Sequence, residues 1–178
     1  MKQEFVISAV GLNLPGIVAR VSKAVYDSKA NFKDSSMTLL GNHFALMVLV
    51  VADDDEIARN LTDACNKLER DRELDINLFP IDDKYRGFGP EESVPNYEIR
   101  VKGLDRMGIV YRTSQLMASL GINIVELETK LVEAKDGTPI FSLRTAVVVP
   151  ENVKEETLRK DLKLLAEDNR ETISVIRI

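Results

Sequence analysis

Residues 11–18 read Gly11-Leu12-Asn13-Leu14-Pro15-Gly16-Ile17-Val18, and they join the apolar run Phe5–Val10 to a segment whose apolar residues have helical spacing. This order predicts a strand, a tight turn and the start of a helix. The first N–H groups of a helix lack partners within it and lie at the positive end of its dipole, so such a turn can hold an anion. Gly11 and Gly16 allow a positive φ or the close approach of a ligand, and Pro15 presets φ. One copy alone can equally be only a turn.

The same pattern returns at an offset of 92 residues, where residues 103–110 read Gly103-Leu104-Asp105-Arg106-Met107-Gly108-Ile109-Val110. The offset also superposes identical pairs outside the turn, namely Arg20 on Arg112, Ser22 on Ser114 and Asn31 on Asn123. A single register explains all of these pairs, so the chain is predicted to contain two copies of one structural unit. In both copies the asparagine stands where the helix has ended and the next strand begins.

The repeated unit resembles the ACT domain. In that family a βαββαβ unit carries a Gly-x-Asp-x-Pro-Gly-type turn after its first strand and often an Asn opening its second strand, and it binds small effectors, usually amino acids. The resemblance covers nearly the whole chain, twice. It implies an α+β fold of two ferredoxin-like βαββαβ units side by side, each with an antiparallel sheet and its helices on one face. We expect the first strands and helices to pair across a pseudo-two-fold, with each turn facing the other domain.

The length of 178 residues fits two domains of about 80 residues each, which are small enough to lean on each other. We predict a first domain over residues 1–81, a linker rich in Gly, Pro and acidic residues over 82–95, and a second domain over 96–178. Helices are expected near residues 16–28, 54–71, 108–120 and 152–168. Strands are expected at residues 5–10, 31–40, 44–51, 76–80, 97–102, 123–132, 140–149 and 173–178.

The charge balance excludes some functions. The 24 basic and 29 acidic side chains, with a pI near 5.1, argue against direct binding to DNA or RNA, so any role in gene control would run through a protein. The single cysteine, Cys65, excludes an internal disulfide framework and fits a reducing compartment. The sequence contains no signal-peptide pattern and no apolar run long enough to span a membrane, so we expect a cytoplasmic protein.

The two copies differ on the sheet face that the helices leave open. In the first copy the central strands Phe5–Val10 and Phe44–Val51 are apolar at odd and even positions, whereas Tyr97–Lys102 in the second alternates with charged residues. A strand that is apolar on both faces is usually buried on both. We therefore expect the open face of the first domain to be covered by the same surface of a second chain, in a homodimer or a larger assembly. The alternative is an apolar face that stays exposed.

The sequence carries none of the familiar motifs for catalysis or metal binding. His43 lies beside a predicted hairpin turn, and one histidine with one cysteine supports neither a zinc site nor a Cys/His catalytic pair. The acidic groups Asp53-Asp54-Asp55 and Glu155-Glu156 stand at helix starts, where capping and the helix dipole explain them. Cys65 falls on the apolar side of a helix and is expected in the core. The sequence predicts no catalytic residue, no metal site and no cofactor, hence a protein that is not an enzyme.

The repeated turns and asparagines suit a free amino acid. Its carboxylate would meet the N–H groups of the turns, and an Asn carboxamide can donate to the carboxylate and accept from the ammonium. Asp105 adds a negative charge for the ammonium, whereas its counterpart Asn13 is neutral, so the second turn is expected to bind more strongly. The predicted ligand-binding residues are Asn13, Leu14, Pro15, Gly16, Ile17, Asn31, Asp105, Arg106, Met107, Gly108, Ile109 and Asn123. The alternative role for Asn31 and Asn123 is a helix C-cap or turn, because Asn tolerates the left-handed conformation. Leu14 and Met107 depart from the family's Arg-like and Pro positions.

The segment from Asn31 to Gly41, followed by the apolar strand, resembles the first half of the glycine cleavage system transcriptional repressor family. Members of that family are tandem ACT proteins thought to hold a transcription activator in check in response to glycine. A similar Pro-Gly-Ile-Val turn opens the N-terminal domain of formyltetrahydrofolate deformylases, whose catalytic domain has no counterpart here. The resemblance implies a regulatory protein in which a small amino acid, glycine or serine, at a domain or subunit interface alters contact with a protein partner. The alternatives are an interaction module with vestigial pockets and a regulatory subunit of an amino-acid biosynthetic enzyme.

Overall fold

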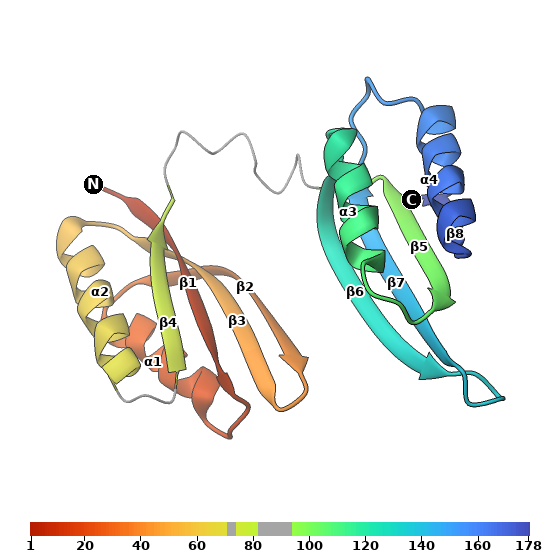
Figure 1. The fold of residues 1–178 in the computed structure, drawn as a ribbon. Coiled ribbons are helices and arrows are strands. Elements are labelled where there is room, and N and C mark those ends of the chain that lie inside the picture. The colour runs from red at the N-terminus through yellow and green to blue at the C-terminus, as the bar shows by residue number, and fades with distance from the viewer. Residues whose placement is uncertain (71–73, 82–93) are drawn as a thin grey trace. The chain divides into compact units, whose positions relative to one another are not determined.

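The computed structural model describes residues 1–70, 74–81 and 94–178. The chain divides into two compact units, Met1–Arg86 and Gly87–Ile178 (Figure 1). Most of the predicted linker, 82–95, lies outside the described residues. The domain limits 1–81 and 96–178 and the side-by-side arrangement therefore stay predictions.

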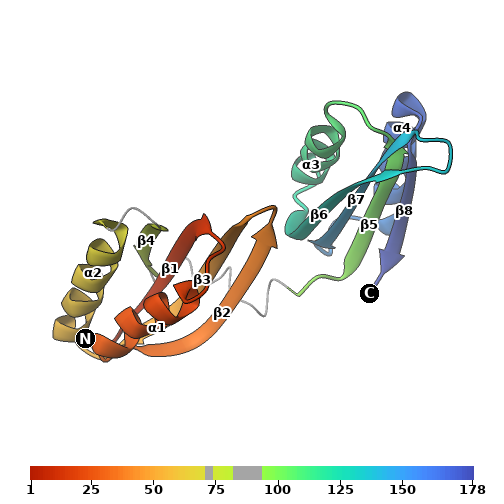
Figure 2. The ribbon, with the colours of Figure 1, turned by 90° about the horizontal axis from the view of Figure 1, so that it is seen from below.

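The first unit has the predicted βαββαβ order. Its elements are β1 (Gln3–Leu12), α1 (Ile17–Asp27), β2 (Asn31–Leu40), β3 (His43–Ala52), α2 (Asp55–Arg70) and β4 (Leu74–Pro80). The strands form one antiparallel sheet in the order β2-β3-β1-β4, so the two apolar strands are central, as predicted. Both helices cover the same face of this sheet (Figure 2).

Alternation along the central strands builds the first core. Phe44, Val48 and Val50 of β3 are buried with Ile7 of β1 beneath the helices.

The Asp54 carboxylate caps α2, because its Oδ1 accepts hydrogen bonds from the N–H groups of Glu56 at 2.9 Å and Ile57 at 2.8 Å. This confirms the expectation that the acidic run at residues 53–55 caps a helix. Leu61 and Cys65 on the apolar side of α2 are buried in the same core.

The second unit repeats the fold. Its elements are β5 (Tyr97–Leu104), α3 (Ile109–Ser119), β6 (Asn123–Glu133), β7 (Pro139–Val148), α4 (Glu155–Asn169) and β8 (Thr172–Arg177), and its sheet order is β6-β7-β5-β8. Helix α4 begins three residues later than the predicted residue 152. The Val153 N–H donates to the Pro150 carbonyl at 2.9 Å in a turn, and Lys154 is still extended, so neither residue can belong to the helix.

The open faces of the two sheets differ in chemistry, as the sequence indicated. On the first sheet Val6 pairs with Leu49 and with Phe79, whose side chain is 53% exposed, and Met47 beside them is 55% exposed. On the second sheet Glu98 forms ion pairs with Arg100 and Arg144. The bond from Arg144, and then the one from Arg100, lowers the pKa of the Glu98 carboxyl below its usual 4.5.

Within the described residues, none of the helices combines the length and apolarity needed to span a membrane.

Candidate functional site

The two strand-to-helix turns have the same backbone conformation. Gly16 is the N-cap of α1 with φ 91° and ψ −6°, and Gly108 is the N-cap of α3 with φ 93° and ψ 1°. These angles lie in the left-handed region, which favours glycine because a Cβ would crowd the following carbonyl. The repeated glycine is therefore a backbone requirement of both turns.

Neither helix start carries a side-chain cap. Glycine has no side chain to accept from the N–H groups at the second and third helical positions, and no other side chain of the described residues caps α1 or α3. Both turns are tied to the hairpin of their own unit. The Asn13 N–H donates to the Asn42 carbonyl at 2.9 Å, and the Asp105 N–H donates to the Pro139 carbonyl at 3.2 Å. The result is a held turn with N–H donors at the positive end of a helix, which is the arrangement an anion needs.

The predicted turn residues fall into two groups. Ile17 and Ile109 are buried, so their side chains anchor the helices in the core and only their backbones face the turn. The remaining positions are exposed or, for Gly108, partly exposed: Asn13, Leu14, Pro15 and Gly16 in the first turn, and Asp105, Arg106, Met107 and Gly108 in the second. Met107 is 96% exposed, so this departure from the family pattern contributes nothing to the core.

The two asparagines lie away from the turns of their own units. Asn31 opens β2 beyond the far end of α1, and it pairs with Val51, which itself pairs with Glu4 at the start of β1. The turn follows the other end of β1. The 11 residues of α1 alone separate the two places by about 16 Å. Asn123 likewise opens β6 beyond the end of α3 that lies away from the second turn. A ligand at one turn therefore lies far from the Asn31 or Asn123 carboxamide of the same unit.

The alternative role of these asparagines as left-handed helix caps is wrong. The residues with positive φ after α1 and α3 are Lys29, with φ 62°, and Gly121, with φ 68°. Asn31 and Asn123 are instead the first residues of their strands, and both are exposed. Among the described residues neither side chain has a hydrogen bond, so both carboxamides are available to a ligand.

Two residues outside the predicted set bear on the second turn. Arg112 of α3 folds back over Gly108 and donates from Nη1 to the Met107 carbonyl at 3.3 Å. Its Nη2 lies 3.5 Å from Oε1 of Glu171, whose side chain is only 3% exposed. The repeat marks Arg112, which superposes on Arg20, but it gives no sign of Glu171.

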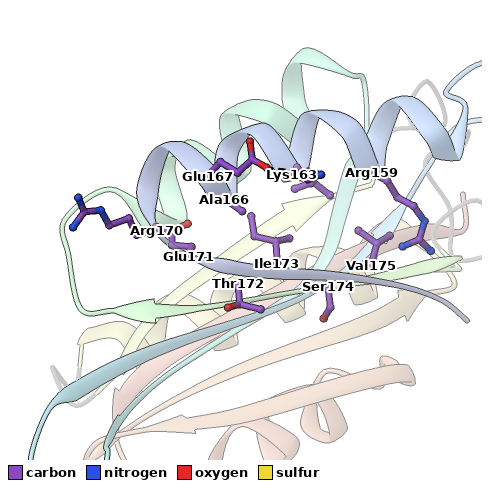
Figure 3. Close-up of a pocket in the computed structure, with 11 residues that line it drawn as sticks. Arg159, Lys163, Ala166, Glu167, Arg170, Glu171, Thr172, Ile173, Ser174 and Val175 are labelled. Carbon is purple, nitrogen blue, oxygen red and sulfur yellow. Dashed lines mark ion pairs between the residues drawn. The ribbon is translucent and has the colours of Figure 1, made fainter.

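A groove of about 670 Å³ lies between α4 and β8 (Figure 3). Glu171 stands at one end of it, beside Arg170, and the side chains of Arg159 and Lys163 line the helix wall. In the described part of the chain β8 pairs only with β5, so the groove follows an edge of the sheet that is free there. An extended segment of another protein could hydrogen-bond to such an edge.

The remaining candidates for chemistry are Cys65 and His43. Cys65 is buried in the first core, and burial raises the pKa of its thiol to about 11, so it is not a thiolate at neutral pH. The expectation of a core cysteine is confirmed. His43 is exposed at the hairpin, where its Nδ1 lies 2.7 Å from Oδ1 of Asn42. Among residues 1–70, 74–81 and 94–178, no three His, Cys, Asp or Glu side chains gather in a way that could hold a metal.

The comparison with known proteins agrees with the βαββαβ fold of the first unit. Residues 3–77 match the family model of the ACT domain. The chain is 30% identical over 82 residues to a UPF0237 protein of Methanopyrus kandleri, a match that covers 46% of this chain and 90% of that protein. It is 42% identical over 45 residues to a UPF0237 protein of Methanocaldococcus jannaschii, covering 25% of this chain and half of that protein.

Two solved structures share the fold of the entire chain. One is an unknown protein from Galdieria sulphuraria, 28% identical with a TM-score of 0.78, in a match that covers 100% of this chain and 99% of that one. The other is named as a candidate glycine cleavage system transcriptional repressor and is 19% identical with a TM-score of 0.73. That match covers 100% of this chain and 98% of the other. The chain is a tandem ACT-domain protein and belongs to the same family as the UPF0237 protein of Methanopyrus kandleri.

Proposed function

We propose that this chain is a non-enzymatic regulatory protein that binds a small amino acid, with glycine or serine favoured, at its strand-to-helix turns. The observation that carries the proposal is the uncapped helix start behind a left-handed glycine, which occurs twice in the same conformation. The N–H groups there suit the carboxylate of the ligand. At the second turn the exposed Asp105 suits its ammonium, and an Asn31 or Asn123 carboxamide of a second copy of the chain completes the contacts.

The bound amino acid acts by changing how the protein meets a partner. A site that draws on two subunits is formed only in some arrangements of those subunits, so the ligand favours these arrangements over others. The partner we propose is a protein that regulates transcription of glycine metabolism, and the acidic pI of 5.1 supports control through a protein rather than through DNA. The name of the similar candidate glycine cleavage repressor is consistent with this choice. The cytoplasm is the proposed location.

A second candidate is an interaction module, such as a regulatory subunit of an amino-acid biosynthetic enzyme, whose turns no longer bind a ligand. The groove beside the free edge of β8 favours it, because a sheet edge suits an extended protein segment. In that case the partner contact would not depend on any amino acid.

Calorimetry against a panel of amino acids separates the two functions. We expect heat of binding with glycine or serine at millimolar concentration or below, and weaker but measurable binding of the corresponding amino-acid amides. Capture of partners from lysate, with and without that amino acid, then separates a transcription regulator from an enzyme. No binding by any amino acid, together with a partner complex indifferent to all of them, would establish the interaction module instead.

A further inference from the structure

The Arg112 guanidinium lies in front of the second turn. Its Nη1 donates to the Met107 carbonyl at 3.3 Å, and a Cβ placed on Gly108 would lie 2.8 Å from this same nitrogen. The uncapped N–H groups of α3 begin at Gly108. A positive side chain and the positive end of a helix therefore meet at one place, which favours an anion more strongly than either does alone.

Glu171 holds the guanidinium there. Its carboxylate lies 3.5 Å from Arg112 Nη2, and its side chain is 3% exposed. Figure 3 shows Glu171 below the end of α4, where its N–H donates to the Ala166 carbonyl at 3.0 Å. A Cβ on Gly103 would lie 2.9 Å from the Glu171 Cγ, so the glycine at this position makes room for the glutamate. Gly103 of β5 and Glu171, which directly precedes β8, thus fix Arg112 of α3 over the turn.

The guanidinium retains capacity to bind a ligand. Its two bonds, at 3.3 and 3.5 Å, are long compared with about 2.7–2.9 Å for charge-assisted bonds. Its Nε is buried and has no hydrogen-bond partner among the described residues. The side chain as a whole is 33% exposed, so donors remain within reach of a molecule at the turn. A planar guanidinium with five N–H groups can grip a carboxylate through two bonds.

The first turn is built differently although the arginine is repeated. Leu74, which pairs with Gly11, stands where Glu171 stands beside Gly103, and it is buried. Nothing lies within 4 Å of a Cβ placed on Gly16. Arg20 instead lines a hollow between α1 and α2 with Lys23, Asp27 and Lys67. The apolar Leu74 offers no charge that could draw an arginine toward the first turn.

We propose that Arg112, positioned by Glu171, reads the α-carboxylate of the ligand at the second turn, and that the first turn lacks this reader. The inference rests on the proposed function, because it assumes that a free amino acid is the ligand. It makes the second turn the one that distinguishes an amino acid from its amide. Arg112 also adds a second reason, beside the charge of Asp105, for the second turn to bind the ligand more strongly than the first.

The test compares the affinities of serine and serinamide, and of glycine and glycinamide, by calorimetry on the full chain. Arg112→Gln should lower the affinity for the amino acid about tenfold or more, which is the loss expected for a charge-assisted bond. The affinity for the amide should not change. Arg112→Lys should retain part of the discrimination. The matched control Arg20→Gln should change neither affinity. An equal loss for amino acid and amide would mean that Arg112 is merely structural, and no loss for either would also overturn the proposal.

Glu171 is tested as a positioning residue. Glu171→Leu, which reproduces Leu74, should lower the ratio of amino-acid to amide affinity, and adding it to Arg112→Gln should cause no further loss. If Glu171→Leu left the ratio unchanged, Glu171 would not position the reader. If the unaltered chain bound no amino acid at all, the proposed function and this inference would both fail. Binding with an unchanged ratio in Arg112→Gln would overturn the inference alone.

Discussion

Gly16 and Gly108 adopt the same left-handed conformation in different surroundings. Open space lies beside Gly16, whereas the end of the Arg112 side chain lies beside Gly108. Any residue with a side chain would be strained at either position, because φ is near 90° at both. A bulky substitution at either glycine would therefore mix a folding effect with a binding effect, and a small substitution compared between the two sites separates them.

Gly108→Ala and Gly16→Ala should each cost about 1 kcal/mol of folding stability. The costs should be similar, because the end of the Arg112 side chain can move away from the new methyl group. Denaturant unfolding measures both costs. The effect on amino-acid affinity should be larger at Gly108, where the methyl group displaces the guanidinium. A loss of stability several times greater at Gly108 would show that Arg112 cannot move as this account requires.

Asp105→Asn should lower the affinity for the favoured amino acid by about tenfold, since the ammonium loses its charged acceptor. The matched change Asn13→Asp puts that charge on the first turn and should strengthen any binding there. Titration calorimetry with glycine and serine measures both variants. The stronger role given to the second turn is contradicted if Asp105→Asn leaves the affinity for every amino acid unchanged.

Strands and helices show how much of the fold could be predicted. A single 92-residue offset placed both turns, and helical periodicity located α1, α2 and α3 to within one residue at each end. The βαββαβ order and the central position of β1 and β3 followed from the same pattern. The prediction was less accurate at α4, where a turn at Pro150 precedes the helix.

The candidate site could be predicted only in part. The turns and their glycines are local in sequence, so the repeat revealed them. Arg112 and Glu171 lie 59 residues apart. Leu74 and Glu171 occupy equivalent places beside β1 and β5 but do not share the 92-residue register. Aligning the two copies at this offset therefore does not place Leu74 opposite Glu171, and the difference between them stays hidden in the sequence. The separation of each asparagine from its own turn also requires the strand directions, which periodicity alone does not give.

The charged open face of the second sheet predicts a pH dependence. The bonds from Arg144 and Arg100 lower the pKa of Glu98 below 4.5 in the folded state. A lowered folded-state pKa contributes stability above the unfolded value, and this contribution is lost as the pH falls through the folded value. The stability difference between the unaltered chain and Glu98→Gln should be constant from pH 7 to about 5 and shrink below 4.5. Urea unfolding across this range measures it, and a gap that widened in acid would contradict the assigned pKa direction.

At the scale of the whole molecule, the first unit's open apolar face predicts self-association. Ala45 and Ser142 occupy equivalent open-face places, since Ala45 pairs with Val10 of β1 and Ser142 pairs with Lys102 of β5. Ala45→Lys should reduce the mass of the particle in solution, because a charge in a buried apolar interface is costly. Ser142→Lys is the control and should leave the mass unchanged. Light scattering with size-exclusion chromatography measures both. If Ala45→Lys altered neither size nor solubility, the face would not be an interface.

The claim that the backbone N–H groups of the repeated turns bind an amino acid is tested most directly by amide NMR. Glycine and serine are titrated into the full chain labelled with ¹⁵N, and the shift of each backbone amide is followed. The account predicts saturable shifts centred on residues 108–111, with Arg112 side-chain signals moving in parallel, and smaller or weaker shifts at residues 16–19. Shifts absent from both turns, or centred on the groove between α4 and β8, would contradict it.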